Sequence, residues 1–313
     1  MVTVSVVLPC YNGARWIDQA IDSVLSQSYP DFELVIINDG STDSSEKKII
    51  PYLRDKRVRY ISQRNSGFST AINRGIKENR ADLISFIGQD DVWMPEKLML
   101  QTKYLTKHEN ISLVHSDYFF INSEGIIIDK AKSRSRDFTS RREVIKSLFL
   151  DNFIGFETVL VKRKCFDDVG LLDEHMVGFS DHDMWLRITG SFNIGYLALP
   201  LVKKRHHELQ LSVSETNYVL RDEFLLVKKA LDRYPFLHDF ERKKLGSLYY
   251  SWGITLLQKG NIPASKQKLL KAILSQPWSL KAIAAYIAPA VYTFAFSQYQ
   301  RFLHANRSKL FES

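Results

Sequence analysis

The sequence lacks several features that would assign it to a specialised class of protein. Only two cysteines occur in 313 residues, Cys10 and Cys165, and their wide separation argues against a disulfide framework and for a reducing compartment. The first residues lack the basic segment of a secretory signal, so we expect no leader. No Gly-x-Gly-x-x-Gly motif follows the first predicted strand, which disfavours a dinucleotide-binding dehydrogenase. The overall composition, 45% hydrophobic and 25% charged, is typical of globular proteins.

The whole chain has a net charge of +8. Its acidic residues are scarce in the C-terminal third. Residues 221–313 contain 15 lysines and arginines against 6 acidic residues, whereas residues 1–220 contain 28 against 29. A basic excess confined to one region suits an anionic surface such as a membrane face, and we expect no nucleic-acid binding. A solvated basic helical face would give the same composition.

Short apolar segments alternate with amphipathic ones through the first hundred residues. Apolar and β-branched runs predict buried parallel strands at residues 4–8, 32–37, 58–61 and 83–87. Helical spacing of apolar residues between these runs predicts an α/β fold with a doubly wound, mostly parallel sheet and helices on both faces. Right-handed crossovers then bring the strand-end loops to one edge of the sheet, where we expect a pocket. These loops are residues 9–13, 38–42, 65–68 and 88–91.

Two adjacent carboxylates, Asp90 and Asp91, follow the fourth predicted strand after a turn at Gly88. Open α/β sheets bind ligands past the carboxyl ends of their strands, and paired carboxylates there can hold a hard divalent cation against phosphate oxygens. The simpler interpretation is a helix N-cap with a favourable charge at the helix dipole, just before Pro95 in the first turn. On this stretch alone, both interpretations remain open.

The chain is long enough for one large domain or for a domain with an appendage. Strand-like runs at 111–122, 157–161 and 192–199, and a cationic loop at 203–207, complete a predicted α/β domain over residues 1–215. Consecutive helices are predicted over residues 216–313, a basic C-terminal region for contact with an acceptor, a partner or a membrane.

Two parts of this C-terminal region have distinct features. Residues 249–259 and 261–273 resemble a single tetratricopeptide-like hairpin, which cannot bury its own apolar face. Residues 282–300 carry no formal charge but are marginal in length and polarity for a membrane span. A packed helix, an in-plane interfacial helix and a span all remain open for them, and the basic flanks favour the cytoplasmic face of a membrane.

A series of ordered motifs identifies a family. Val-Ser-Val-Val-Leu-Pro-Cys-Tyr-Asn-Gly stands at 4–13, Ile-Asn-Asp-Gly-Ser-Thr-Asp at 37–43, Arg-Asn-Ser-Gly-Phe at 64–68 and Ala-Ile-Asn-Arg-Gly at 71–75. Gln-Asp-Asp-Val-Trp-Met-Pro follows at 89–95 and Ser-Asp-His-Asp-Met-Trp-Leu-Arg at 180–187. In this order and at these spacings the motifs resemble the family 2 glycosyltransferases of bacterial surface-polysaccharide synthesis, which have a GT-A fold. The resemblance covers roughly residues 2–215.

The resemblance implies a nucleotide-sugar donor, usually linked to uridine diphosphate, and an inverting transfer. By position, the nucleoside would be lined by Pro9, Tyr11 and Asn12, and the carboxylate of Asp39 would accept from the N–H of the base. Asn65 and Gly67 would lie under the ribose or pyrophosphate. Asp90 would contact the ribose or the metal shell.

The same resemblance assigns the metal and catalytic residues. Asp91 and His207 would bind Mn²⁺ or Mg²⁺, and Arg205 would contact the pyrophosphate. Asp181 matches the general base, which removes the proton of the acceptor hydroxyl as that hydroxyl attacks the sugar. Two positions depart from the family pattern, because Gly88 and Gln89 replace the start of its Asp-Ala-Asp-Asp motif and Ser180 replaces the glutamate before the base.

The sequence therefore predicts a metal-dependent inverting glycosyltransferase that acts on a saccharide or lipid-linked acceptor. We expect it in the cytoplasm, with peripheral contact to the inner face of the cytoplasmic membrane through the C-terminal helices. Two alternatives remain. A sugar-phosphate nucleotidyltransferase would want a glycine-rich phosphate loop with a Lys or Arg after the first strand, which residues 9–13 lack. A catalytically degenerate nucleotide-binding scaffold would explain Gly88 and Ser180.

Overall fold

The computed structural model describes residues 3–131, 138, 140–207, 216–289 and 291–292. The chain divides into two compact units. The first comprises Met1–Leu148 and Asn152–Glu215, and the second comprises Phe149–Asp151 and Thr216–Ser313. The sequence also predicts a polar, basic loop at 131–142, and Ser212 follows Arg205-His206-His207 as in the Arg-x-His loop of the family that the chain resembles. Ser212 and most of residues 131–142 lie outside the described residues.

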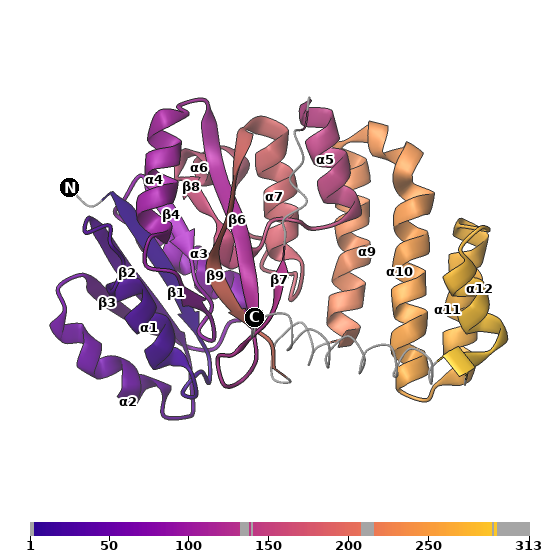
Figure 1. The fold of residues 1–313 in the computed structure, drawn as a ribbon, viewed down its shortest axis with the longest axis horizontal. Helices are drawn as coiled ribbons and strands as arrows, with labels where there is room; N and C mark the ends of the chain where they lie inside the picture. Colours follow the sequence, from indigo (N-terminus) through magenta and orange to yellow (C-terminus); the bar gives the residue numbers. More distant parts are fainter. Residues whose placement is uncertain (1–2, 132–137, 139, 208–215, 290, 293–313) are drawn as a thin grey trace, which may run out of the picture. The chain divides into compact units, whose positions relative to one another are not determined.

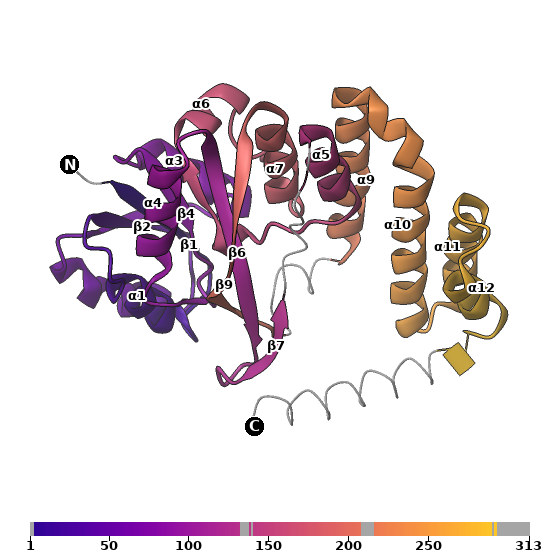
Figure 2. The same cartoon turned by 45° about the horizontal axis from the view of Figure 1, so that its top comes forward.

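The first unit is built on a mixed sheet, which within the described residues has nine strands in the order β3-β2-β1-β4-β8-β6-β9-β5, with β7 beside β6 (Figure 1). The strands β1 to β4 pair in parallel, whereas β8 runs antiparallel to both β4 and β6, and β5 runs antiparallel to β9. The β6–β9 pair is parallel, and β7 forms a hairpin with the far end of β6 (Figure 2). Their bounds are β1 (Val4–Cys10), β2 (Phe32–Asp39), β3 (Val58–Gln63), β4 (Leu83–Phe86), β5 (Val92–Trp93), β6 (Ile111–Ile121), β7 (Ile127–Ala131), β8 (Leu160–Lys162) and β9 (Asn193–Arg205).

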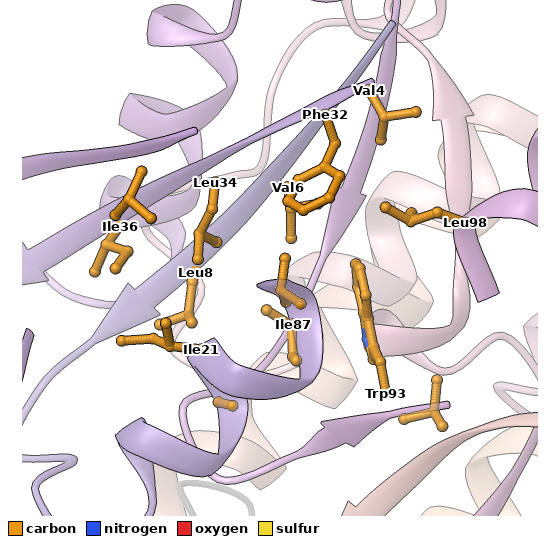
Figure 3. Close-up of a cluster of buried hydrophobic side chains, with 14 of the residues drawn as sticks. Val4, Val6, Leu8, Ile21, Phe32, Leu34, Ile36, Ile87, Trp93 and Leu98 are labelled. Carbon is orange, nitrogen blue, oxygen red and sulfur yellow. The ribbon is translucent and has the colours of Figure 1, made fainter. Parts of the chain in front are cut away.

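Helices cover both faces of this sheet, because successive side chains of a strand point to opposite sides. Val4, Val6 and Leu8 of β1 are fully buried in a cluster with residues of the first and fourth helices (Figure 3). Val7 faces the other way and packs so closely on Gly75 that a side chain there would collide with it. The helices are α1 (Ile17–Leu25), α2 (Ser45–Ile49), α3 (Phe68–Glu78), α4 (Lys97–Lys107), α5 (Arg141–Leu150), α6 (Lys164–Val169) and α7 (Ser180–Ser191), with 3-10 turns η1 (Ile50–Arg54) and η2 (Phe156–Thr158).

The predicted α/β sheet with helices on both faces is confirmed, and two local predictions are wrong. The run at 157–161 was expected to be a strand, but Glu157 lies in the 3-10 turn η2 and β8 begins only at Leu160. The segment at 203–207 was expected to be a loop, but β9 continues to Arg205. It continues because its end pairs with β6 on one side, Arg205 opposite Ile121, and with the short β5 on the other.

The second unit consists of α9 (Thr216–Arg233), the 3-10 turn η3 (Pro235–Leu237), α10 (His238–Gln258), α11 (Ile262–Ser275) and α12 (Leu280–Ile287). The predicted helical hairpin is present in α10 and α11: Gly260 has a φ of +76°, and the Asn261 side chain accepts from the Ala264 N–H at the start of α11. Gly253 lets the two helices approach closely, since a side chain there would collide with Leu269.

None of the helices in the described part of the chain is both long enough and apolar enough to cross a bilayer. The charge-free run at 282–300 is described only to residue 292, with residue 290 left out. The first part of this run belongs to α12. That helix packs in the second unit through its buried residues Ala282 and Ala285.

Candidate active site

The four predicted strand-end loops meet at one edge of the sheet. The loop after β1 is joined to the loop after β4, because the Tyr11 N–H donates to Gln89 Oε1 at 2.9 Å and Gln89 Nε2 donates to the Tyr11 carbonyl at 3.1 Å. It is also joined to the loop after β2, because Asn12 Oδ1 accepts from the backbone N–H groups of Thr42 and Asp43 at 2.8 and 3.3 Å. Gln89, one of the departures from the family pattern, therefore has a structural role between two loops.

Asp39 joins the loop after β2 to the loop after β3. Its Oδ1 accepts from the Ser66 N–H and from Gln63 Nε2, and its Oδ2 accepts from the Gly67 N–H at 2.9 Å. A carboxylate oxygen can accept two hydrogen bonds, so Oδ2 retains room for a donor on a bound base. Gly67 has a φ of +92° with open space beside it, which requires glycine for its backbone and leaves volume for a ligand.

The remaining predicted nucleoside residues line the same edge. Pro9 is buried near the end of β1, where it pairs with Ile37 of β2, whereas the Tyr11 side chain is 47% exposed. Asn65 is exposed, and its backbone nitrogen lies close to Gly40 at the end of the neighbouring loop. Apolar, aromatic and amide groups are thus gathered around Asp39, and their contacts with a nucleotide stay a prediction.

The Asp90–Asp91 turn is held by the end of β9. His207 Nε2 lies 2.8 Å from Asp90 Oδ2, and the Arg205 N–H donates to Asp91 Oδ1 at 2.9 Å. The other two carboxylate oxygens, Asp90 Oδ1 and Asp91 Oδ2, both lie over Gly88, where a Cβ atom would come within 2.9 and 2.7 Å of them. Glycine at position 88 therefore leaves a small space onto which both carboxylates open.

Arg205 forms part of the framework under this turn. It is fully buried, and its guanidinium donates to the carbonyls of Asp90, Asn122 and Ser123 at 2.8–3.1 Å and to Gln19 Oε1 at 2.7 Å. These contacts fix the turn against α1 and the end of β6. The assignment of Arg205 to the pyrophosphate stays a prediction, but in this geometry its hydrogen-bond donors are directed to protein oxygens.

Trp16 packs against the same cluster. Its ring centroid lies 4.4 Å from that of His207, and the Arg205 guanidinium lies over its face at 5.2 Å. The indole N–H donates to the Ser123 carbonyl at 3.2 Å. Trp16 thus orients His207 toward Asp90, a role that sequence reasoning did not anticipate.

The residues at this turn suit a divalent cation. In the described residues no three His, Cys, Asp or Glu side chains meet as a complete metal site. Mg²⁺ and Mn²⁺, however, commonly use one or two carboxylates and complete their coordination with substrate phosphates. Asp90 and Asp91 open onto one space and His207 contacts Asp90, so the set supplies part of such a shell. These are the residues that would hold the cation, with a nucleotide diphosphate supplying the rest.

Asp181 is the second residue of α7, which begins directly after Phe179, whose φ of +58° bends the chain into the helix. Burial raises the pKa of the Asp181 carboxyl above its ordinary value, and Glu157 raises it further, while the His182 N–H and Lys204 lower it. The neighbouring polar residues have structural partners: Asp183 pairs with Arg187 at 2.9 Å, and Ser180 hydrogen-bonds to Ser69 at 2.9 Å. The Asp181 carboxyl is instead hydrogen-bonded by the backbone N–H of His182, and its assignment as the general base stays a prediction.

An ion pair between Glu157 and Lys204 acts electrostatically on both Asp181 and Asp91. Glu157 is buried in η2, and Lys204 Nζ lies 3.0 Å from its Oε1. Burial raises the pKa of Asp91 well above its ordinary value, and the charges of Asp90 and Glu157 add to this, whereas Lys204 lowers it. The same two residues, Glu157 and Lys204, also act on Asp181. Asp91 and Asp181, the two carboxylates predicted to act on a ligand, therefore lie within reach of the charges of one ion pair.

The sequence does not predict this pair. No local motif marks Glu157 or Lys204, because they meet only in the folded sheet.

Two tryptophans, Trp93 in the motif at 89–95 and Trp185 in the motif at 180–187, could by their sequence positions either contact a sugar or pack in the core. Both are buried, with 2% and 1% of their surface exposed, and the Lys97 ammonium lies 3.9 Å from the Trp93 ring. Packing is the interpretation that the structure favours.

The model of glycosyl transferase family 2 matches residues 5–169 of the chain. An uncharacterized glycosyltransferase of Rickettsia felis is 30% identical over 216 residues, which are 69% of this chain but 36% of that protein. The chain therefore spans about a third of the length of that relative. An Escherichia coli protein named UDP-Glc:alpha-D-GlcNAc-diphosphoundecaprenol beta-1,3-glucosyltransferase is 26% identical over 79% of this chain and 90% of its own length.

Among solved structures, TarS of S. aureus (residues 1–349, in complex with UDP-GlcNAc) superposes with a TM-score of 0.64. The likeness covers 97% of this chain and 89% of that one at 18% identity. It confirms the GT-A type of α/β fold with additional C-terminal helices.

Proposed function

The chain belongs to glycosyl transferase family 2, and from this we propose that it is an inverting, metal-dependent glycosyltransferase. Its donor is a nucleotide diphosphate sugar, with uridine diphosphate as the nucleotide, and its acceptor is a saccharide or lipid-linked intermediate of cell-surface polysaccharide. The observation that supports the proposal is that Asp90, Asp91 and His207 lie at one turn, and that Asp91 and Asp181 both lie near the charges of the Glu157–Lys204 pair. A metal-bound diphosphate and a base for the acceptor hydroxyl would both be available at such a site.

The donor would bind along the strand-end loops. Asp39 has an oxygen available for the N–H of a uracil base, and exposed Tyr11 offers an aromatic face to it. The space beside Gly67 and over Gly88 would take the ribose and the diphosphate. The diphosphate then reaches Asp90, Asp91 and His207, which would hold the cation. A bound Mn²⁺ or Mg²⁺ would neutralise the charge that develops on the departing nucleoside diphosphate.

The transfer step would use Asp181 as its base. The acceptor hydroxyl oxygen attacks C1 of the donor sugar and gives its proton to the Asp181 carboxylate, while the bond from C1 to the diphosphate oxygen breaks on the opposite face. One displacement inverts the configuration at C1. The reaction needs the ionised form of Asp181, and Lys204 favours that form because it lowers the pKa of Asp181.

The printed name of the E. coli relative supports the acceptor class. That protein transfers glucose to GlcNAc carried on diphosphoundecaprenol, a lipid-linked saccharide, from a uridine diphosphate donor. We extend this class, but not the particular sugars, to the present chain. Such an acceptor lies in a membrane, so we place the reaction at the inner face of the cytoplasmic membrane.

Turnover of a panel of uridine diphosphate sugars in the presence of Mn²⁺ tests the proposal, with release of uridine diphosphate as the signal. Asp181→Asn should lower turnover about 10²–10⁴-fold, as expected for loss of a general base, while it still binds uridine diphosphate. Asp167→Asn, which changes an exposed carboxylate of α6, is the matched control and should keep full activity. If the wild type binds the nucleotide but turns over no sugar and transfers none to any acceptor, the scaffold alternative replaces the proposal.

A further inference from the structure

The C-terminal part of the chain combines positive charge with a complete lack of carboxylate side chains. Between Arg242 and Phe311 the sequence contains eleven lysines and arginines and neither aspartate nor glutamate. Ordinary globular surfaces mix both signs, so a stretch of this length without an acidic residue carries a large positive charge, although Glu223 of α9 pairs with Lys244 at 3.2 Å. Such a charge attracts an anionic surface.

The same region exposes an unusual set of large apolar side chains. Trp278 is 93% exposed and Leu280 is 79% exposed, at the connection between α11 and α12. The set, which we name the α11–α12 outer face, comprises Leu270, Leu274, Trp278, Leu280, Ile287 and Val291. Single exposed apolar residues are common on soluble proteins, but a group gathered on α11, α12 and the segments that join and follow them marks an interaction surface.

Helical spacing places these residues away from the packed sides of their helices. In α11 the buried residues are Ser265, Leu269 and Ala272, and Leu270 and Leu274 lie one turn apart on the other side of the helix. In α12 the buried residues are Ala282 and Ala285, and Leu280 and Ile287 lie about two turns apart on the opposite side. The apolar residues are therefore not part of the core of this unit. Figures 1 and 2 both show α11 and α12 side by side, beyond α10 from α9.

Cationic side chains lie on the same two helices. Lys271 of α11 and Lys281 of α12 are exposed, and their ammonium groups lie over the rings of Tyr249 and Tyr250 of α10 at 5.4 and 4.5 Å, on the side of these helices toward α10. Apolar side chains, an exposed tryptophan and lysines together are the composition of protein surfaces that sit in the headgroup region of a bilayer.

We propose that the α11–α12 outer face binds the surface of a bilayer that contains anionic phospholipids. Charge decides between the occupants: a second copy of the chain would bring an equally basic face against this one, whereas anionic headgroups complement it. A nucleic acid would match the charge but would leave Trp278 and the aliphatic side chains without an apolar partner. The proposal deepens the proposed function, since it assigns a surface that would hold the enzyme where a lipid-linked acceptor lies.

Flotation of the full chain with vesicles tests the membrane-binding proposal directly. The experiment requires no catalysis, so the membrane-binding proposal can fail while the proposed function stands, and the proposed function can fail while membrane binding is observed. We expect binding to vesicles of phosphatidylcholine with phosphatidylglycerol and much weaker binding to phosphatidylcholine alone. Leu274→Ser combined with Trp278→Ser should lower the partition coefficient on the mixed vesicles about tenfold or more, because two inserted apolar side chains are lost. Lys271→Gln combined with Lys281→Gln should lower it about tenfold on the mixed vesicles only.

Matched control variants separate this face from general surface effects. Ile50→Ser with Leu53→Ser removes two exposed apolar side chains of η1, and Lys103→Gln with Lys107→Gln removes two exposed lysines of α4. Both controls should bind vesicles as the wild type does, and circular dichroism and thermal unfolding should show that all four variants are folded. Equal binding by the wild type and the Leu274/Trp278 variant would overturn the proposal. Vesicle binding that does not depend on phosphatidylglycerol would also overturn it. A third contradictory result would be that the wild type and the other variants are dimers in solution while the Leu274/Trp278 variant is a monomer.

Discussion

The Nζ atom of Lys204 lies 3.0 Å from Oε1 of Glu157 in the candidate site. The negative charge of Glu157 and the positive charge of Lys204 act on both Asp91 and Asp181. Burial alone would lower the pKa of Lys204, but Glu157 and Asp91 together raise it above its ordinary value. Lys204 thus favours the ionised forms of Asp91 and Asp181, against the effect of their burial on the pKa.

Removal of this cation should destabilise the fold. Lys204→Met leaves the Glu157 carboxylate buried without its ion pair and should cost about 1–3 kcal/mol. The cost is below that of a fully buried pair because the Lys204 side chain is 34% exposed and partly screened by solvent. Urea denaturation measures the effect. Adding Glu157→Gln should recover most of the loss, and a double variant that costs the sum of the two singles would show that the residues do not interact.

The acid limb of the pH–rate profile should report Asp181. Burial raises its pKa, and the base must be ionised to accept a proton, so kcat/KM should fall as the pH drops through that raised pKa. Because Lys204 lowers the pKa of Asp181, Lys204→Met should move the limb to higher pH. The profile is measured with wild type and variant under the same donor concentration. A limb that stays in place or moves to lower pH would contradict the assignment of the base.

Gly88→Ala should displace the two carboxylates of the predicted donor site. The new Cβ would lie 2.7 Å from Asp91 Oδ2 and 2.9 Å from Asp90 Oδ1, so both carboxylates must move. We expect Mn²⁺-dependent affinity for uridine diphosphate to fall about tenfold or more, with a stability loss of about 1–3 kcal/mol from overpacking. Gly260→Ala, at a φ of +76° with open space around it, is the control. It should cost about 1–2 kcal/mol of stability and leave nucleotide affinity unchanged.

Arg205→Lys separates a framework role from a pyrophosphate contact. A lysine cannot reproduce the guanidinium hydrogen bonds to three carbonyls and Gln19, so the variant should lose about 2–4 kcal/mol of stability. Thermal unfolding without ligand measures this loss. If stability is unchanged while affinity for uridine diphosphate falls, Arg205 contacts the pyrophosphate as the family resemblance implied, and the framework role is wrong.

The sequence predicted those parts of the fold and the site that are determined by short, continuous segments of the chain. Apolar runs such as residues 4–8 and 32–37 carry their own strand signal, and a loop that follows each parallel strand must emerge at the same edge. This is why the meeting of Tyr11, Asp39, Gly67 and Asp90 at one edge could be predicted without a structure.

The parts that sequence did not predict depend on contacts between distant segments. Glu157 precedes an apolar run and was expected in a strand, yet it lies in a 3-10 turn facing Lys204, 47 positions later in the chain. Arg205 was expected in a loop because lysines and histidines surround it. Its strand conformation comes from pairing with Ile121, which no spacing rule reveals.

The most direct test of the donor site is calorimetric titration with uridine diphosphate, with and without Mn²⁺, on the wild type and on Asp91→Asn. The asparagine keeps an oxygen for the Arg205 N–H, so the fold should be retained while one charged metal ligand is lost. We predict binding to the wild type that Mn²⁺ strengthens, and loss of that strengthening in Asp91→Asn. Equal affinity with and without Mn²⁺ in both proteins would contradict a metal-dependent donor site at Asp90, Asp91 and His207.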